Sequence, residues 1–231
     1  MKRFYKQATV GEDNGILLDG RAVKTPGSAP LAPPSAQLAE AIADEWAAQG
    51  ETIDPRAMPL TGLANAAIDR IAPAPESFAA GLAAYGESDL LCYRAEGPAS
   101  LVARQAELWD PILAWARERY DIAFEVTAGI THKPQPPETI ARLAAAVGTR
   151  DPFELAGLSP LVTVSGSLVI ALALAEGALS LTAAWAAASL DEQWQLDQWG
   201  ADEEAAEALA GRRADFAAAS RFLALLKTDE A

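Results

Sequence analysis

The order of apolar and polar positions predicts a short β-rich beginning followed by helices. Residues 4–10 and 15–23 have the composition of strands, and Asp13-Asn14-Gly15 and Asp19-Gly20 are typical of tight hairpin turns. Three prolines between positions 29 and 34 then exclude regular structure there. The chain is therefore predicted to begin with a small β-unit of roughly three to five strands.

From residue 35 onward, apolar side chains recur with the period of a helix. Ser35 is a candidate N-cap for a helix whose apolar face runs through Leu38, Ile42 and Trp46 and ends near Gly50. Thr61 is a candidate cap for the next helix. Further helices are predicted over residues 77–85, 99–120 (with Pro111 either bending it or starting a new helix), 138–147, from 151, 183–199 and 202–226, with a β-like segment at 124–127.

The most apolar run covers residues 159–175 and raises the question of a membrane span. Its uninterrupted part, Leu168–Ala175, is far shorter than the roughly 20 residues that a spanning helix needs. We therefore expect no membrane insertion but a buried central helix, with residues 183–199 as its neighbour in a helical hairpin across Gly177.

These elements together predict an α+β fold, in which a small N-terminal β-rich domain is followed by a larger, mainly α-helical domain. The pattern changes at the proline-rich segment Ala72-Pro73-Ala74-Pro75. We expect an N-terminal domain of residues 1–75, with the strands and one or two helices, and a C-terminal helical domain of residues 76–231.

Residues 189–200 combine indoles, amides and carboxylates at helical spacing. On a helix that continues from Trp185, the side chains of Glu192, Leu196 and Trp199 share the face of Trp185, and Trp194 lies roughly opposite Glu192. A carboxylate among large apolar groups is either paired within the fold or available to a partner. Both interpretations of Glu192 stay open on the residues alone.

Composition narrows the choice of partners. The chain has 32 acidic and 18 basic residues and a formal net charge of −14, which disfavours nucleic acid and anionic membranes and favours a basic protein surface. The lone Cys92 indicates a reducing compartment, and the lone His132 excludes a multi-histidine metal site. No apolar signal segment follows the N-terminus, so we expect a cytoplasmic bacterial chain or a mature chain of the mitochondrial matrix.

The sequence contains few signs of catalysis. It has no glycine-rich phosphate loop and no serine elbow, and the adjacent carboxylates of Asp191 and Glu192 point about 100° apart on a helix, so they form no dyad. Cys92 has apolar neighbours and is expected to be a buried, inert thiol. We expect no catalytic residue, metal or cofactor, although Glu192 as a general acid or base stays open.

Several short motifs span nearly the whole chain in a fixed order. They are Arg3-Phe4-Tyr5-Lys6, Leu18-Asp19-Gly20-Arg21, Lys24-Thr25-Pro26, Glu45-Trp46-x-x-Gln49, Met58-Pro59-Leu60-Thr61 with Asp69, Asp89-x-Leu91-Cys92-Tyr93-Arg94, Gln105-x-x-x-Trp109-Asp110-Pro111, Gly166-Ser167-Leu168, and Leu190-Asp191-Glu192-x-x-Gln195 through Trp199-Gly200. With these motifs in this order, the chain resembles the ATP12-like family of chaperones for the α subunit of the F-type ATP synthase.

The resemblance implies the same two-part fold, no catalysis, and a protein that holds the unassembled α subunit until the β subunit replaces it. It also implies that Glu192 is functionally important and that Trp46 is the tryptophan of the Glu-Trp motif. Gln193 stands where relatives often carry a third acidic residue, and Trp194 stands where tyrosine or phenylalanine is common. The expected partner-binding residues are Glu192, Asp191, Trp194, Gln195, Trp199 and Trp46.

We hypothesise that Glu192 imitates a contact that the β subunit makes in the finished catalytic head, such as one to an arginine of the α subunit. Two alternatives remain: a small hydrolase or lyase using Glu192 with Asp191 or Cys92, and an acidic helical adaptor without a dedicated client. A deep closed pocket around Glu192 favours the enzyme, a flat charged surface favours the adaptor, and an exposed apolar patch favours the chaperone. The free protein is expected to be a monomer.

Overall fold

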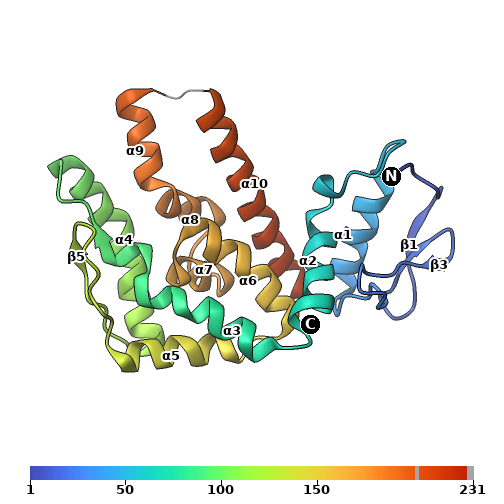
Figure 1. The fold of residues 1–231 in the computed structure, drawn as a ribbon, viewed down its shortest axis with the longest axis horizontal. Coiled ribbons are helices and arrows are strands. Elements are labelled where there is room, and N and C mark those ends of the chain that lie inside the picture. Colours follow the sequence, from blue (N-terminus) through green and yellow to red (C-terminus); the bar gives the residue numbers. More distant parts are fainter. Residues whose placement is uncertain (201–202, 228–231) are drawn as a thin grey trace. The chain divides into compact units, whose positions relative to one another are not determined.

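The structure, a computed structural model, describes residues 1–200 and 203–227 (Figure 1). The chain forms two compact units. Of the described residues, the first contains 1–75, 151–157 and 218–227, and the second contains 76–150, 158–200 and 203–217. The predicted order of a small sheet followed by helices is confirmed. The division into two domains at residue 75 stays a prediction.

The sheet of the first unit has three short antiparallel strands. They are β1 (Ala8–Val10), β2 (Ile16–Leu18) and β3 (Arg21–Ala22), in that spatial order, with Thr9 opposite Leu17. The turns need backbone in the left-handed region, which Asn14 (φ 58°), Asp19 (φ 48°) and Gly20 (φ 77°) supply. The turn sequences thus give the hairpins that were predicted from them.

Helix α1 (Ala36–Ala47) lies against β1 and β2. It begins at Ser35, whose Oγ accepts a hydrogen bond from the Leu38 N–H at 3.4 Å, as an N-cap does. Leu38 and Ile42 are fully buried one turn apart, so the predicted apolar face is the face that packs into the unit.

Helix α2 (Pro59–Ala66) is capped differently from the prediction. Thr61 lies inside the helix, and the cap is the Glu45 side chain, which accepts hydrogen bonds from the Leu60 N–H, the Thr61 N–H and the Thr61 hydroxyl, each at 2.8 Å. A carboxylate satisfies two free N–H groups and also interacts favourably with the helix dipole. A short 3₁₀ helix (Pro55–Ala57) precedes α2 and a short π-helix (Ala67–Ile71) follows it.

The first unit also includes the start of α6 (Pro152–Ser165) and the end of α10 (Glu203–Leu226). The rings of Phe153 and Phe222 stack 6.3 Å apart, and Gly157 lets Leu223 approach so closely that a Cβ would meet it at 2.6 Å. Ser35 Oγ donates to the Leu225 carbonyl at 2.6 Å. These contacts bring the end of α10 together with the start of α6 and with Ser35 near the beginning of the chain, within one unit.

The second unit is helical, with a two-stranded parallel pair and two short 3₁₀ turns. Its further elements are α3 (Pro75–Ala83), the turns Ala84–Ser88 and Leu90–Cys92, β4 (Tyr93–Arg94), α4 (Ala99–Tyr120), β5 (Thr127–Ala128), α5 (Pro137–Gly148), α7 (Leu168–Ala175), α8 (Leu181–Ala188) and α9 (Leu190–Trp199). Helix α7 packs against α4 and α8, and all but one of its residues are buried (Figure 1). The predicted buried central helix is confirmed.

Two helix breaks differ from the prediction. The apolar run 159–175 is divided between α6 and α7, because Gly166 adopts φ 67° and Ser167 caps α7. Residues 183–199 are not one helix but α8 and α9, separated at Ser189 (φ −104°, ψ 14°). By contrast, α4 runs through Pro111 as one helix, so Pro111 does not start a new one.

A buried carboxylate ties the break before α7 to the chain near Cys92. Asp89 is fully buried and accepts hydrogen bonds from the Ser167 hydroxyl (2.7 Å), the Val169 N–H (3.0 Å) and the Leu91 N–H (3.1 Å). Burial raises the pKa of Asp89 to about 6 despite these donors. Its role is to hold two segments of the second unit together.

Candidate functional site

A groove lies along one face of α9 in the second unit. Asp191, Trp194, Gln195 and Gln198 occupy positions i, i+3, i+4 and i+7 of the helix, so their side chains share that face. Together with Trp199, Gly97, Pro98 and Leu101 they line an open space of about 360 Å³, called here the α9 groove. Four of the six predicted partner-binding residues therefore meet at one place.

The groove has a large exposed apolar wall. Trp199 is 79% exposed at the end of α9, and Trp194 is half-buried on the preceding turn. An exposed indole offers much apolar area with little conformational freedom to lose, which is why tryptophan is frequent at the centre of protein interfaces. This surface suits contact with another molecule.

Asp191 supplies the charge in the α9 groove and is held in place by a residue that the sequence did not single out as functional. Gln105 is buried in α4 and donates from Nε2 to Asp191 Oδ1 at 2.8 Å, while its own Oε1 accepts from the Ala95 N–H at 2.8 Å. The second oxygen of Asp191 has no hydrogen-bond partner among the described residues. The sequence feature that could have identified Gln105 is a polar amide on the apolar face of an amphipathic helix, where a buried amide needs a hydrogen-bond partner.

Glu192 points elsewhere and is paired within the chain. Its Oε1 accepts from Arg212 Nη1 of α10 at 2.8 Å, both side chains are 43% exposed, and Glu192 does not line the α9 groove. Because the helix breaks at Ser189, Trp185 does not continue the Glu192 face but packs on Phe216, with ring centroids 5.7 Å apart. The structure therefore pairs Glu192 within the fold, which is one of the two interpretations that the residues alone left open.

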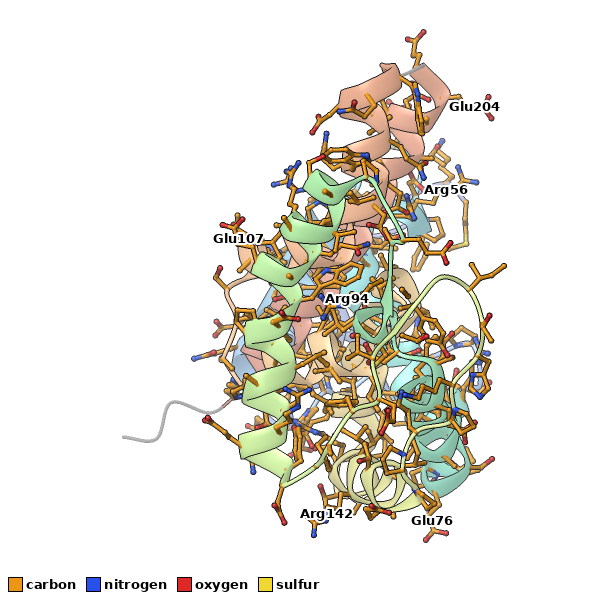
Figure 2. All side chains as sticks on the ribbon, turned by 90° about the vertical axis from the view of Figure 1, so that its left-hand side faces the viewer. Arg56, Glu76, Arg94, Glu107, Arg142 and Glu204 are labelled. Atoms are coloured by element: carbon orange, nitrogen blue, oxygen red, sulfur yellow. The ribbon has the colours of Figure 1, made fainter. Side chains whose placement is uncertain are left out.

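Helix α4 positions the elements that carry the groove. Trp109 is fully buried and its indole N–H donates to the Ala187 carbonyl of α8 at 2.9 Å. Arg94 lies beside α4, over the Trp109 ring and 2.7 Å from Asp110, whereas Glu107 projects from the outer side of the same helix (Figure 2). Arg104 of α4 also pairs with Asp197 of α9 at 3.5 Å. The Gln-x-x-x-Trp-Asp-Pro motif is therefore a support for α8 and α9.

Trp46 belongs to the other unit. It lines a separate space of about 700 Å³, called here the Trp46 groove, together with Met1, Phe4, Tyr5, Leu18, Asp19, Arg21, Ala22, Val23 and Lys24. Its ring packs edge-on against Tyr5 with centroids 5.8 Å apart, and the Tyr5 hydroxyl donates to the Trp46 carbonyl at 2.6 Å. The predicted site residues thus fall on two surfaces of two units.

The residues that the enzyme alternative would use are unsuited to it. Cys92 is buried, and burial together with the nearby carboxylate of Asp89 raises the pKa of its thiol to about 12. A protonated, inaccessible thiol is no nucleophile at neutral pH. Glu192, in its exposed ion pair, does not lie in a deep closed pocket.

The described residues contain neither a metal-binding cluster nor a membrane-spanning helix. Within residues 1–200 and 203–227, no group of histidine, cysteine and acidic side chains is arranged to bind a metal ion, and His132 instead contacts the Tyr93 hydroxyl at 3.0 Å. Every helix in the described part of the chain is too short or too polar to cross a bilayer.

A family model and a curated protein that resemble this chain agree on one family. A family model described as ATP12 chaperone protein matches residues 2–117. The Protein atp12, mitochondrial, of Schizosaccharomyces pombe is 28% identical over 222 residues, which cover 89% of this chain and 76% of that protein.

Solved structures agree over nearly the full length. Atp12 from Paracoccus denitrificans is 42% identical, with 98% of each chain covered and a TM-score of 0.91. The Atu1473 protein from Agrobacterium tumefaciens is 45% identical, with 98% of this chain and 86% of that chain covered and a TM-score of 0.92. With a family model that matches half of its residues and relatives above 40% identity across almost all of them, the chain belongs to the family of ATP12 chaperone proteins.

Proposed function

We propose that this protein is a chaperone of ATP synthase assembly that binds the unassembled α subunit through the α9 groove. The observation that carries the proposal is one open groove that is lined both by the exposed indole of Trp199 and by the carboxylate of Asp191. A chaperone for an unfinished interface must offer apolar area and a few polar groups that select the client. The bound α subunit is then released when the β subunit takes its place.

The chemistry of the α9 groove favours a basic side chain of the client. Asp191 keeps one oxygen without a partner among the described residues, and the rings of Trp194 and Trp199 line the same groove. A guanidinium group can pair with a carboxylate and at the same time stack on an indole. The acidic net charge of −14 attracts a basic client surface over a longer range.

Glu192 has a second role in the proposal. Its carboxylate binds the guanidinium of Arg212, so it already accepts the kind of group that an arginine of the α subunit would present. We infer that a client arginine takes the place of Arg212, and that Glu192 thereby imitates a contact made by the β subunit in the finished head. Both side chains are accessible enough for this exchange.

The test is capture of purified ATP synthase α subunit by the tagged full chain. Wild type is expected to retain the α subunit, whereas Trp199→Ala and Asp191→Asn lose at least tenfold in affinity and Glu192→Lys loses binding. Ile130→Ala is the matched control, since Ile130 is fully exposed in the same unit and lies outside the groove. Equal capture by wild type and Trp199→Ala moves the site elsewhere, and no capture by wild type removes the proposal.

The adaptor alternative has less support than the chaperone. An adaptor without a client is expected to have a flat, charged surface, but α9 presents an apolar groove with an exposed tryptophan. The hydrolase or lyase alternative would need a nucleophile that the buried Cys92 does not provide.

The relatives support a proposal for the place of action. Two of them come from Paracoccus denitrificans and Agrobacterium tumefaciens, and the third is named as a mitochondrial protein. We therefore propose the bacterial cytoplasm, or the mitochondrial matrix for an organellar chain, with the protein acting as a monomer toward its client.

A further inference from the structure

The Trp46 groove has an apolar floor that belongs to the core of the first unit. Tyr5 and Leu18 are buried members of the core cluster, and Val23 and Trp46 pack against it half-buried. The floor is fixed by the Tyr5 hydroxyl bond to the Trp46 carbonyl and by the strand register of β1 and β2. The groove is therefore a preformed feature, and at about 700 Å³ it can accept one or two large side chains.

Unlike the floor, one wall of this groove is exposed to solvent. Phe4 is 66% exposed and Met1 is 73% exposed, while the Phe4 ring lies edge-on to Tyr5 with centroids 5.4 Å apart. Exposed apolar side chains that adjoin an apolar hollow are a common sign of a binding surface, whereas single scattered ones are not.

The rim of the groove is basic. Arg21 and Lys24 line it, are exposed, and make no side-chain hydrogen bond or ion pair with any described residue. The acidic residue of the lining, Asp19, is occupied by the backbone N–H groups of Lys6 and Gln7, which hold the pKa of its carboxyl below the usual range.

The basic rim is unusual for this chain. Residues 1–35 carry five basic side chains against three acidic ones, although the whole chain has 18 basic and 32 acidic residues. Positive charge is in the minority on this acidic chain. Where it is concentrated beside an exposed apolar hollow, it favours binding of a negatively charged partner to that hollow.

We propose that the Trp46 groove is a second docking surface, which binds an acidic protein segment carrying a bulky apolar side chain. The apolar side chain enters between Phe4 and Trp46, and carboxylates next to it pair with Arg21 and Lys24. This chemistry is the reverse of the α9 groove, where an acidic group awaits a basic one. The two grooves therefore recognise different segments, and this proposal does not depend on the α subunit being the client.

Fluorescence anisotropy with the full chain tests the proposal. The probe is a fluorescein-labelled peptide in which one phenylalanine and one leucine are flanked by four glutamates, and the comparison peptide has lysines in place of the glutamates. We expect the acidic peptide to bind wild type at least tenfold more tightly than the basic one. The double variant Arg21→Glu/Lys24→Glu and the variant Phe4→Ser are each expected to lose at least tenfold.

The matched control is Arg56→Glu/Arg70→Glu. Both arginines are exposed in the same unit and lie outside the groove, and the control changes the net charge by the same amount. It should bind the acidic peptide within threefold of wild type, and circular dichroism should show that all variants are folded. Equal binding of the two peptides, or an equal loss in the control pair, overturns the proposal. Loss in the Trp199→Ala variant instead would place the peptide in the α9 groove.

Discussion

The carboxylate of Glu192 lies 2.8 Å from the guanidinium of Arg212, so an ion pair joins α9 to α10 within the second unit. The two residues are 20 positions apart in the sequence and on different helices. Since both side chains are 43% exposed, water competes for each of them and the pair adds little to stability. Because breaking this ion pair costs little free energy, Glu192 can exchange Arg212 for a basic group of a client.

The double-mutant cycle of Glu192→Gln and Arg212→Gln measures this pair. We expect a coupling energy in urea unfolding below about 1 kcal/mol, because the pair is exposed. In contrast, Glu192→Gln is expected to weaken capture of the α subunit at least tenfold, while Arg212→Gln retains or strengthens it, since the carboxylate is freed for the client. Full binding by Glu192→Gln would show that the carboxylate has no part in recognition.

The indole N–H of Trp109 is expected to matter for stability. Trp109→Phe leaves a gap in the core and leaves the Ala187 carbonyl without its donor, so we expect a loss of about 2–3 kcal/mol in the free energy of unfolding. Trp115→Phe is the control, because Trp115 is only half-buried in the same helix and keeps its edge contact with Tyr120 as phenylalanine. Similar losses in both variants would mean that the bond to Ala187 contributes nothing.

The carboxylate of Glu45 is expected to stabilise the first unit as the cap of α2. Glu45→Ala removes the acceptor for the N–H groups of Leu60 and Thr61 and should lower the free energy of unfolding by about 1–2 kcal/mol. The neighbouring Asp44 is exposed, and Asp44→Ala should change the free energy of unfolding by less than about 0.5 kcal/mol. Urea unfolding compares the two, and equal effects would argue against the cap.

Burial of Asp89 predicts a pH dependence of stability. Its pKa is raised from 3.8 to about 6, so between these values the folded state binds a proton that the unfolded state does not. The contribution of Asp89 to stability is therefore present at low pH and is lost as the pH rises through about 6. The full change is about 3 kcal/mol, of which about half falls between pH 5 and pH 7.

Asp89→Asn is expected to remove that slope. The unfolding free energy of the wild type minus that of the variant should fall by about 1.5 kcal/mol from pH 5 to pH 7, whatever the variant's own stability. The exposed Asp44→Asn is the control and should follow the wild-type curve. A difference between wild type and Asp89→Asn that is the same at every pH would contradict the raised pKa.

Local signals were sufficient for most of the fold. Turn residues with positive φ placed the hairpins, Ser35 placed the start of α1, and the eight apolar residues Leu168–Ala175 identified the central helix. One wrong prediction, the cap of α2, concerns an interaction between segments distant in sequence. Nothing near Thr61 indicates that Glu45, 16 positions earlier, occupies the helix end, so the sequence alone favours the local candidate.

The candidate groove on α9 was predictable only in part. The helical spacing of α9 brings Asp191, Trp194 and Gln195 onto one face. The sequence analysis instead grouped Glu192 with Trp199, whereas Trp199 lines the groove and Glu192 does not. The break at Ser189 was missed because its serine hydroxyl bonds back to the Trp185 carbonyl, an arrangement equally available inside a continuous helix. The bonds of Asp191 to Gln105 and of Glu192 to Arg212 depend on tertiary packing, which helical periodicity does not contain.

The bond from Ser35 to the Leu225 carbonyl spans 190 positions of the chain. On the ribosome, the strands and α1 emerge long before α10 exists, so this part of the first unit must wait for about 190 further residues before these partners are made. Phe222, buried against Phe153, belongs to this later segment. A nascent chain of this chaperone thus exposes apolar surface of its own until α10 has been synthesised, and for that period it is itself in need of protection.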